Sequence, residues 1–265
     1  MPKPKTIPVA LTIAGSDSGG GAGVQADLKT FASLGLHGTS ALTCITAQNP
    51  KRVLAIQACQ PAIVRRQMEA VFEALPPAAV KTGMLYSAEI IRVVAAFLRT
   101  HRKTPLVVDP VMISTSGAQL LKPSAVRLLK TRLLPLATLV TPNLDEAEFL
   151  TGRDLKSIED LRWAAKQIHQ EFRCAALVKG GHLRDSKEAI DIFFDGETEL
   201  LLSAPFVKGV HTHGTGCTYS AAITGYLALG YELPDAVAQA KEYISQAIVQ
   251  SQAVGKHSVL NSFWQ

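Results

Sequence analysis

Aromatic and charged residues are both scarce in this sequence, at 6% and 18% of its 265 positions. The basic residues are scattered, as in Arg65-Arg66 and Arg102-Lys103, and no basic run alternates with aromatic residues. A nucleic-acid surface of the stacking type needs both, so we do not expect a nucleic-acid partner. The net charge of +5 suits a small anionic ligand.

Metal-type cysteine pairs and long apolar runs are also missing. The four cysteines lie too far apart for a CxxC pair, which disfavours a zinc site and favours free thiols in a reducing compartment. The apolar stretch at residues 7–14 is broken by Pro8 and Thr12, and it is too short to span a membrane and lacks a cleavage-type ending. We therefore expect a cytoplasmic protein with no membrane partner.

Neither of the two common glycine motifs for nucleotides is complete. The GxxxxGK[ST] phosphate loop is absent. The segment Gly21–Ala26 fits GxGxxA, but the next predicted strand leads into Gln48-Asn49, without the acid that would hold a ribose. A nicotinamide-dependent oxidoreductase is therefore disfavoured and kept only as an alternative. The glycines of this first cluster, Gly15–Gly23, would let the backbone approach a flat ligand, or simply form a tight turn before a helix.

Short apolar runs alternate with amphipathic segments of helical length along the chain. The predicted strands are Val9–Ala14, Ser40–Thr46, Ala79–Lys81, Leu106–Val108, Leu136–Val140 and Ala175–Val178, followed by a hairpin of Ile190–Phe194 and Thr198–Leu202. The predicted helices are Gly23–Leu34, Pro61–Glu73, Ser87–Arg99, Ile158–Glu171, Cys217–Leu229 and Pro234–Gln250.

This alternation predicts an α/β fold, with helices on both faces of a mostly parallel central sheet and a small antiparallel edge. No linker or internal repeat interrupts it, so we expect residues 1–265 to form a single domain. Ligands of such sheets bind beyond the carboxyl ends of the strands, and several predicted strands end in glycine or polar residues.

A second glycine cluster, Gly214–Cys217, precedes a predicted apolar helix. The backbone N–H groups of Gly214, Thr215 and Gly216 would converge there on an anion, with the helix dipole adding to the attraction. Cys217 lies in the first turn of this helix, where we expect its pKa to be depressed. It would then accept a proton from a substrate hydroxyl or hydrogen-bond to it, the alternative being a small buried thiol.

Two acids and a lysine also follow predicted strands. Asp109 and Glu146 would hold Mg²⁺, partly through water, although Asn143 and Glu146 also fit a plain helix capping box. Lys179, before two glycines, would meet a phosphate, with a solvated surface lysine as the alternative. The pair His211 and His213 has no third ligand in view, so a metal site there is disfavoured.

Taken in order along the chain, these motifs resemble the ribokinase superfamily and, within it, the hydroxymethylpyrimidine/phosphomethylpyrimidine kinases of thiamine biosynthesis. The segments that carry the resemblance are Ala14–Phe31, Thr46–Asn49, Val80–Leu85, Val108–Met112, Thr141–Glu148, Val178–His182 and Thr212–Thr218. They span nearly the whole sequence.

The resemblance implies a ribokinase-like three-layer sandwich and a role for each matching residue. The positions implied to line the pyrimidine pocket are Gly15, Ala22, Asp27, Gln48, Met84 and Val111. Asp109 and Glu146 match magnesium-linked acids, and Asn143, Lys179 and Thr212 match contacts to nucleotide phosphates. Gly214, Thr215 and Gly216 match the anion hole, and Cys217 matches the catalytic position, where Asp is usual in the superfamily.

The resemblance further implies ATP as co-substrate, Mg²⁺ and a homodimer, and leaves a monovalent cation open. The implied reaction phosphorylates 4-amino-5-hydroxymethyl-2-methylpyrimidine to the monophosphate and then to the diphosphate. A pyridoxal kinase of the same fold is the first alternative. A catalytically silent vitamin-binding protein is disfavoured because Asp109, Glu146, Lys179 and Cys217 are all present.

Overall fold

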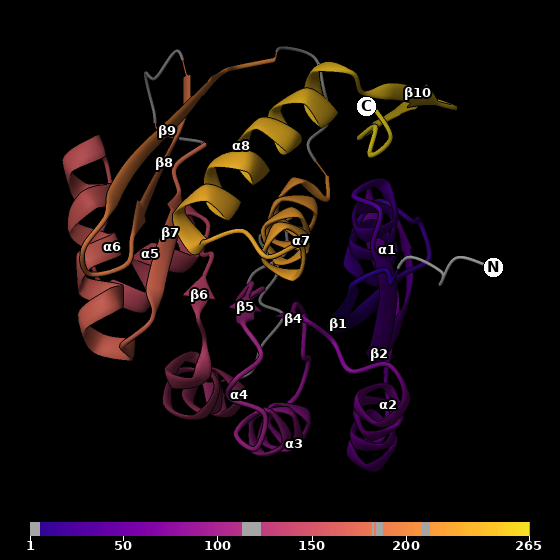
Figure 1. Ribbon diagram of the computed structural model, residues 1–265. Helices are drawn as coiled ribbons and strands as arrows, with labels where there is room; N and C mark the ends of the chain where they lie inside the picture. Colours follow the sequence, from indigo (N-terminus) through magenta and orange to yellow (C-terminus); the bar gives the residue numbers. More distant parts are fainter. Residues whose placement is uncertain (1–5, 113–122, 182, 184–187, 208–212, 265) are drawn as a thin grey trace.

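The computed structural model describes residues 6–112, 123–181, 183, 188–207 and 213–264. Nine of the described strands form one sheet, which crosses the molecule from edge to edge (Figure 1). In chain order these strands are β1 (Val9–Asp17), β2 (His37–Asn49), β3 (Arg52–Ala58), β4 (Ala79–Thr82), β5 (Leu106–Val108), β6 (Leu139–Val140), β7 (Ala175–Lys179), β8 (Glu188–Phe194) and β9 (Glu199–Pro205). Their order in space is β3-β2-β1-β4-β5-β6-β7-β8-β9.

The predicted mostly parallel sheet is confirmed. Strands β1, β2 and β4–β7 are parallel to their neighbours in this set, and the predicted hairpin forms an antiparallel edge as β8 and β9. The opposite edge differs from the prediction, because β2 continues to Asn49 and turns back into the antiparallel strand β3. At this edge the apolar residues Val53 and Leu54 are exposed, so β3 lacks the buried-face pattern by which strands are predicted.

The described helices are α1 (Gly23–Ser33), α2 (Pro61–Ala74), α3 (Ala88–Leu98), α4 (Pro123–Leu128), α5 (Leu144–Thr151), α6 (Ile158–Phe172), α7 (Thr215–Ala228) and α8 (Leu233–Val249). Ser87 caps α3 as predicted, with its Oγ accepting a hydrogen bond from the Ile90 N–H. Helix α4 was not predicted. It continues through a π-helical turn and a 3₁₀ turn to Leu136, so the predicted strand Leu136–Val140 shortens to β6.

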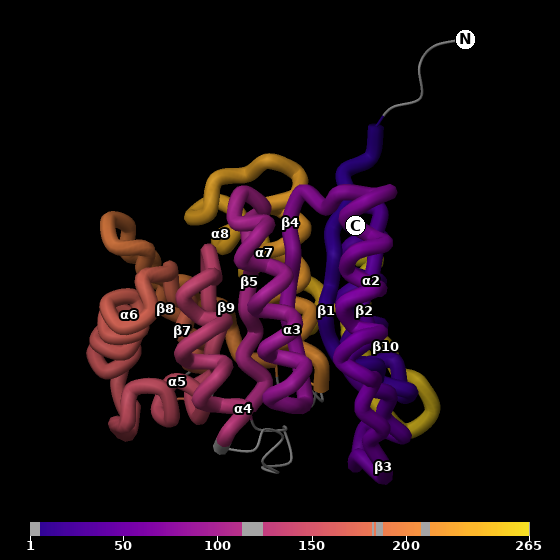
Figure 2. The backbone as a smooth tube through the Cα atoms, turned by 90° about the horizontal axis from the view of Figure 1, so that it is seen from below, coloured from indigo at the N-terminus to yellow at the C-terminus, as the bar shows by residue number. Residues whose placement is uncertain are grey.

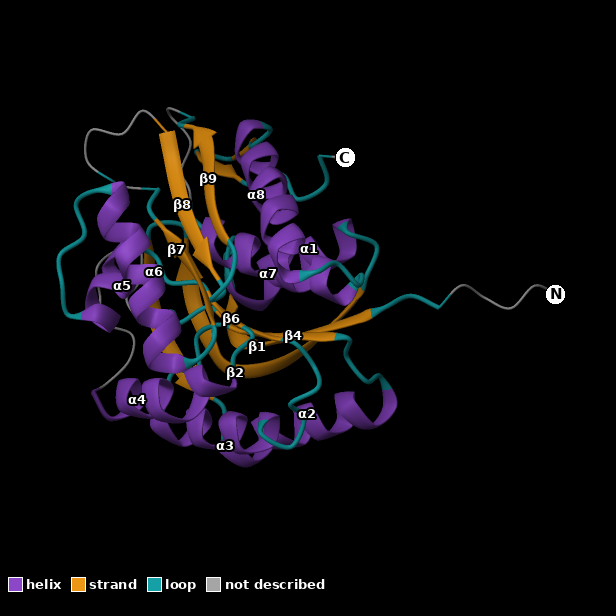
Figure 3. Ribbon diagram, turned by 60° about the vertical axis from the view of Figure 1, so that its left-hand side comes forward, coloured by secondary structure: helices purple, strands orange, loops and turns teal. Residues whose placement is uncertain are grey.

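The helices cover the two faces of the sheet, which gives the expected three layers. Helices α2–α6 share one apolar core with the sheet, and α1, α7 and α8 pack on the opposite face. Figure 2 shows α2 and α3 in front of the strands with α7 and α8 behind, and Figure 3 shows the sheet between the two sets. A separate two-stranded hairpin, β10 (Gln252–Val254) and β11 (His257–Val259), follows α8. None of the described helices combines the length and apolar character needed to cross a membrane.

Helix α7 is buried on nearly all sides, between the sheet and α1 and α8. Small residues make this possible: a Cβ at Gly225 would come within 2.6 Å of the Leu34 side chain. A helix enclosed in this way cannot shift easily, because packed interiors resist changes of volume. Its N-terminus, at the second glycine cluster, is therefore held rigidly beside the carboxyl ends of the central strands.

Candidate active site

The parallel strands bring their carboxyl ends to one edge of the sheet, and most of the predicted site residues meet there. Asp109 follows β5, and it is almost completely buried. Its Oδ1 accepts hydrogen bonds from Thr141 at 3.4 Å and from the Lys179 ammonium at 3.3 Å. Its Oδ2 accepts one from Ser220 of α7 at 3.2 Å. One carboxylate thus joins the ends of β5, β6 and β7 to the first turns of α7.

Lys179 lies in the cleft and not on the solvated surface. Only 13% of its side chain is exposed, and its ammonium is 3.3 Å from where a Cβ of Gly216 would be. Burial alone would lower the pKa of Lys179, but the nearby carboxylates of Asp109 and Glu146 hold it above its usual value. A charged ammonium is therefore placed next to the glycine turn, as a phosphate-binding lysine requires.

The capping box at α5 is present, as the plain interpretation of Asn143 and Glu146 predicted. The Asn143 Oδ1 accepts from the Glu146 N–H, and the Glu146 carboxylate accepts from the backbone N–H groups of Asn143 and Met112, each at 3.0 Å. Burial, and next the charge of Asp109, raise the pKa of Glu146 to about 7. The box explains the position of Glu146 without explaining why a second acid is buried beside Asp109.

A divalent cation fits this pair of acids. Asp109 and Glu146 are both buried, the charge of Asp109 raises the pKa of Glu146, and Lys179 is the only cation among the described residues that forms an ion pair with either. Among the parts of the chain that the structure describes, no group of three or more His, Cys, Asp or Glu side chains could hold a metal. Two carboxylates with water and phosphate oxygens completing the shell is the arrangement that Mg²⁺ commonly takes.

The turn before α7 depends on glycine. Gly214 has a φ of +85°, and a Cβ there would collide with the carbonyl of Gly21. The Gly214 carbonyl accepts the Thr218 N–H at 2.9 Å, which starts the helix and leaves the preceding N–H groups pointing outward. The hydroxyl of Thr215 is buried without a partner among the described residues. The anion site at this turn stays a prediction, and the turn that it requires is present.

The predicted low pKa of Cys217 is wrong. Burial raises the pKa of this thiol to about 11, and the neighbouring charges of Asp109 and Asp27 act in the same direction. Lys81 opposes them but does not compensate. Position at a helix N-terminus favours a thiolate, but around this half-buried thiol the cost of desolvation outweighs that effect. Cys217 is a protonated thiol at neutral pH.

Four of the six positions predicted for the pyrimidine pocket, Gly15, Ala22, Gln48 and Met84, lie in or beside the two glycine clusters. A Cβ at Gly15 would come within 2.9 Å of Met84 Cε, so the backbone of β1 lies directly against this side chain. The Gln48 amide nitrogen is 3.4 Å from His213 Nε2. The Ala22 Cα lies 3.5 Å from where a Cβ of Gly214 would be. These contacts tie β1, β2 and the segment after β4 to the turn before α7.

Val111 is the fifth position, and its backbone has a φ of +36°. A β-branched residue rarely adopts a positive φ, and such strain is found where function requires it. Thr212, predicted to contact nucleotide phosphate, lies outside the described residues, as does His211.

Asp27, the sixth position, is not at the surface of this pocket. It is fully buried, and its carboxylate accepts hydrogen bonds from Lys81 Nζ at 2.7 Å and Thr12 Oγ1 at 2.6 Å. Both of its oxygens are thus engaged in the interior, between β1, β4 and α1. The structure corrects the expectation that Asp27 presents a free acceptor to the substrate.

Asp17 is a site residue that the sequence did not single out. Its carboxylate accepts the backbone N–H groups of Gly19, Gly21 and Ala22 at 2.8, 3.1 and 2.8 Å, and it lies 3.2 Å from His213 Nε2. Burial alone would raise the pKa of Asp17, but hydrogen bonds from His213 and from the backbone hold it below its usual value. The sequence offered one signal for this role: an aspartate just before a glycine-rich turn commonly accepts hydrogen bonds from the N–H groups of the next few residues.

The first glycine cluster therefore folds around Asp17 and packs on the second cluster. A Cβ at Gly21 would come within 2.9 Å of the His213 ring, and one at Gly23 would collide with the carbonyl of Gly15. These glycines allow backbone segments to approach one another closely. Their use in this contact gives no support to a dinucleotide turn.

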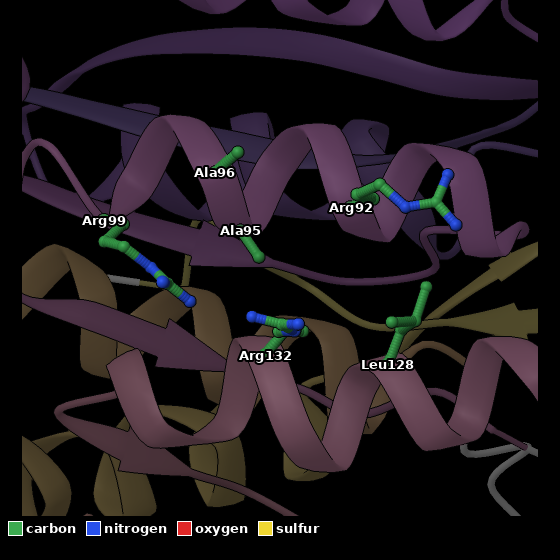
Figure 4. Close-up of a pocket in the computed structure, with 6 residues that line it drawn as sticks. All are labelled: Arg92, Ala95, Ala96, Arg99, Leu128 and Arg132. Atoms are coloured by element: carbon green, nitrogen blue, oxygen red, sulfur yellow. The ribbon is translucent and has the colours of Figure 1, made fainter.

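Two cavities lie away from this site, among helices α3–α6. One, of about 370 Å³, lies between α3 and α4 and is lined by Arg92, Ala95, Ala96, Arg99, Leu128 and Arg132 (Figure 4). The other, of about 820 Å³, is lined by residues of α4, α5 and α6 and the turns after α4. Neither includes a predicted site residue, so the candidate site is defined by its converging groups and not by cavity volume.

Comparison with known proteins shows the family of the chain. The family model described as Phosphomethylpyrimidine kinase matches residues 17–261. The hydroxymethylpyrimidine/phosphomethylpyrimidine kinase of Rhizobium meliloti is 51% identical over 241 residues, covering 91% of this chain and 90% of that protein. The corresponding kinase of Synechococcus elongatus is 46% identical, covering 94% and 95%. The chain spans about half, 51%, of the longer thiamine biosynthesis bifunctional protein ThiED of Geobacter sulfurreducens, to which it is 49% identical.

Solved structures give the same result for the fold. The phosphomethylpyrimidine kinase of Clostridium difficile superimposes with a TM-score of 0.82 at 46% identity, covering 91% of this chain and 99% of that one. An ADP complex of Bacillus subtilis pyridoxal kinase superimposes with a TM-score of 0.89 at 37% identity, covering 97% and 98%. The predicted ribokinase-like fold and the predicted kinase function in thiamine biosynthesis are thus confirmed. The chain belongs to the hydroxymethylpyrimidine/phosphomethylpyrimidine kinase family.

Proposed function

We propose that residues 1–265 form a single kinase domain, which transfers the γ-phosphoryl group of ATP to 4-amino-5-hydroxymethyl-2-methylpyrimidine and then to its monophosphate. The observation that carries this proposal is the convergence of Lys179 and Asp109 on the glycine turn before α7. A cation and a carboxylate lie there beside the start of a helix, whose first N–H groups have no carbonyl partner within the helix, at the carboxyl edge of a parallel sheet.

The phosphate groups of ATP would bind to Lys179 and to the N–H groups of the Gly214–Cys217 turn. Asn143, whose side chain is engaged in the cap of α5, would contribute through its position beside Lys179, to which it is joined by a backbone bridge. Because phosphoryl transfer passes through a loose transition state, charge neutralisation and alignment are what the protein must supply. A rigid α7 supplies the alignment.

Asp109 and Glu146 would hold Mg²⁺, partly through water. When bound, this ion supplies further neutralisation of the phosphate charge. Its positive charge would also favour the ionised carboxylate of Glu146, whose pKa is raised in its absence. An assay of ATP consumption, run with and without potassium, tests the monovalent cation that the sequence leaves open.

Cys217 would orient the acceptor hydroxyl as a hydrogen-bonding thiol. With a pKa of about 11, it is not a ready base in the free protein. In a loose transition state the attacking hydroxyl forms little bond to phosphorus, so it need not be deprotonated beforehand. A group that only orients this hydroxyl is therefore sufficient. Proton removal would then occur late.

The pyrimidine ring would lie against Met84, with Gln48 at its amino edge. Met84 offers an adaptable apolar surface, and a carboxamide both donates to and accepts from an aminopyrimidine. Thr46, whose Oγ1 donates to Gln48 Oε1 at 3.3 Å, would help to fix the Gln48 side chain in place, while Nε2 of His213 donates to Asp17.

Parallel turnover assays test the proposed substrate. ATP consumption is measured with the hydroxymethylpyrimidine, its monophosphate and pyridoxal at equal concentrations. We expect the highest kcat/KM with the two pyrimidines. Pyridoxal is included because the pyridoxal kinase of Bacillus subtilis shares the fold closely; a higher kcat/KM with pyridoxal would contradict the proposal while leaving a kinase.

We also propose that two copies of the chain associate through the β3 edge. Ile45 and Leu54 on β2 and β3 expose 54% and 60% of their surface, and Val53 is exposed beside them. An open edge strand with apolar side chains is self-complementary across a two-fold axis. Light scattering should give a dimer for the wild type and a monomer for Leu54→Glu; a monomeric wild type would contradict this assignment.

A further inference from the structure

A second buried ion pair lies behind the end of β7. Lys241 of α8 donates to Asp191 Oδ2 of β8 at 2.7 Å and to the Ala189 carbonyl at 2.9 Å. The two side chains expose only 10% and 5% of their surface. Neither residue belongs to the site described above.

The other oxygen of Asp191 reaches the backbone of the site. Asp191 Oδ1 accepts the Gly180 N–H at 3.1 Å, and the same N–H also donates to the Ile190 carbonyl at 3.0 Å. In the β7–β8 ladder, Asp191 stands directly opposite Lys179. The Asp191 carboxylate therefore holds the peptide between Lys179 and Gly180 by a hydrogen bond.

The end of β7 is held from its other side as well. The Lys179 N–H donates to the Pro142 carbonyl at 2.9 Å. Gly180 has no space for a side chain, since a Cβ would collide with Leu161 and with the Ile190 carbonyl. The backbone at Lys179 and Gly180 is thus fixed by three neighbouring segments.

Stability alone is a weak reason for a buried ion pair. Removing two charges from water costs about as much as their attraction returns, and apolar pairs of similar volume often serve as well. What an apolar pair cannot supply is the second acceptor that Asp191 offers the Gly180 N–H beside the Ile190 carbonyl. The geometry of the Asp191–Lys241 pair is therefore suited to placing the Lys179–Gly180 backbone precisely.

We propose that Asp191 and Lys241 are positioning residues for phosphoryl transfer, because they fix the Lys179–Gly180 peptide so that the Lys179 ammonium stays beside Gly216 and Asp109. Lys241 keeps the Asp191 carboxylate oriented, and Asp191 holds the peptide. This inference rests on the proposed function, in which Lys179 binds the nucleotide phosphates.

Two neutral double variants isolate the hydrogen bond to Gly180. Asp191→Asn/Lys241→Met keeps an oxygen acceptor, whereas Asp191→Leu/Lys241→Met removes it, and neither leaves a buried charge unpaired. We expect the KM for ATP to be about tenfold higher in the Leu variant, the size of one lost hydrogen bond. The KM for the pyrimidine should agree within about twofold between the two variants, because the bond acts on the nucleotide side.

Combining each variant with Lys179→Ala provides the readout that a merely structural role would not change. If Asp191 acts through Lys179, the difference between the two variants disappears in that background. If Lys179→Ala alone leaves the KM for ATP unchanged, the proposed role of Lys179 fails. If Lys179→Ala raises it but the two Asp191 variants share one KM for ATP, the positioning role alone is overturned.

Thermal melting of each variant reports on folding. Should the Leu variant not fold, Asp191→Ala/Lys241→Met also removes the acceptor with less added volume and replaces it in both comparisons. Arg65→Met/Glu69→Gln, which removes an exposed ion pair of 2.7 Å on α2, serves as the control and should leave both KM values unchanged.

Discussion

The ammonium of Lys179 lies 3.3 Å from Oδ1 of Asp109, with only 13% and 5% of the two side chains exposed. In the unliganded protein each group thus neutralises the other. A nucleotide with its metal ion would offer both a better partner, since phosphate would take the lysine and a cation the carboxylate. The pair is thus a preformed site in which nucleotide phosphate and a cation would replace the ion pair between Lys179 and Asp109.

Replacing Lys179 with Met should therefore weaken nucleotide use specifically. We expect kcat/KM for ATP to fall by about 10–100-fold, the range for losing a hydrogen bond to a charged group. The KM for the pyrimidine should stay within about twofold, because Lys179 lies beside Asp109 and Gly216, whereas Met84 lies against Gly15. Steady-state kinetics with each substrate varied in turn measure both values. A matched control is Lys156→Met, which removes an exposed lysine; an equal loss in both variants would contradict the assignment.

Cys217 should contribute through its hydrogen bond and not through a standing thiolate. We expect Cys217→Ala to lower kcat by about 10²-fold, within the range for a positioned proton-transfer group. Cys217→Ser, which keeps a donor and acceptor at the same place, should retain more activity than the Ala variant. Single-turnover kinetics compare the three proteins. Equal rates for wild type and Cys217→Ala would remove this side chain from the mechanism while leaving the kinase function intact.

The raised pKa of Cys217 also predicts how its chemical reactivity depends on pH. Only the thiolate is alkylated, and below a pKa of about 11 the thiolate fraction rises about tenfold per pH unit. The rate of carboxamidomethylation at Cys217 should therefore keep rising from pH 7 to 10 without a plateau. Mass spectrometry of the peptide that contains Cys217 follows the reaction, with glutathione as the reference thiol. A plateau below pH 8 would show that the thiol is acidic after all.

Some features of the candidate site can be predicted from the sequence and others cannot. The strand exits at Asp109, Asn143 and Lys179 could be predicted, because apolar runs of strand length end just before them and parallel strands share one edge. The glycine turn could be predicted because its residues are adjacent in the sequence. The raised pKa of Cys217 could not, since the charges around this thiol come from separate elements, with Lys81 on β4, Asp109 after β5 and Asp27 on α1.

The missed residues follow the same division. Lys81 stands inside the short strand β4, where sequence patterns give no indication of its partner 54 positions away. Asp17 precedes its own N–H donors locally, but its contact with His213 joins two loops 196 positions apart. Strand β3 was missed because an exposed edge strand has no buried face to produce a pattern. Long-range contacts, not local propensity, determine each of these features.

The buried pair Asp27 and Lys81 provides a test of the correction made for Asp27. If Asp27 is an interior ion-pair partner, Lys81→Met leaves a buried carboxylate without its cation. Such a change costs about 3–5 kcal/mol of unfolding free energy. Asp27→Asn/Lys81→Met removes both charges and keeps an acceptor for Thr12, so it should recover most of that loss.

Urea unfolding of the wild type and the two variants measures these differences. The ordering is what matters: the double variant should be more stable than Lys81→Met, which is the opposite of what two independent losses would give. The control is Lys166→Met, which removes a half-exposed lysine paired with Glu199 at 2.9 Å and should change stability by less than about 1 kcal/mol. If the double variant is the less stable of the two, Asp27 is not held by Lys81, and its carboxylate becomes available again as a direct contact for the pyrimidine.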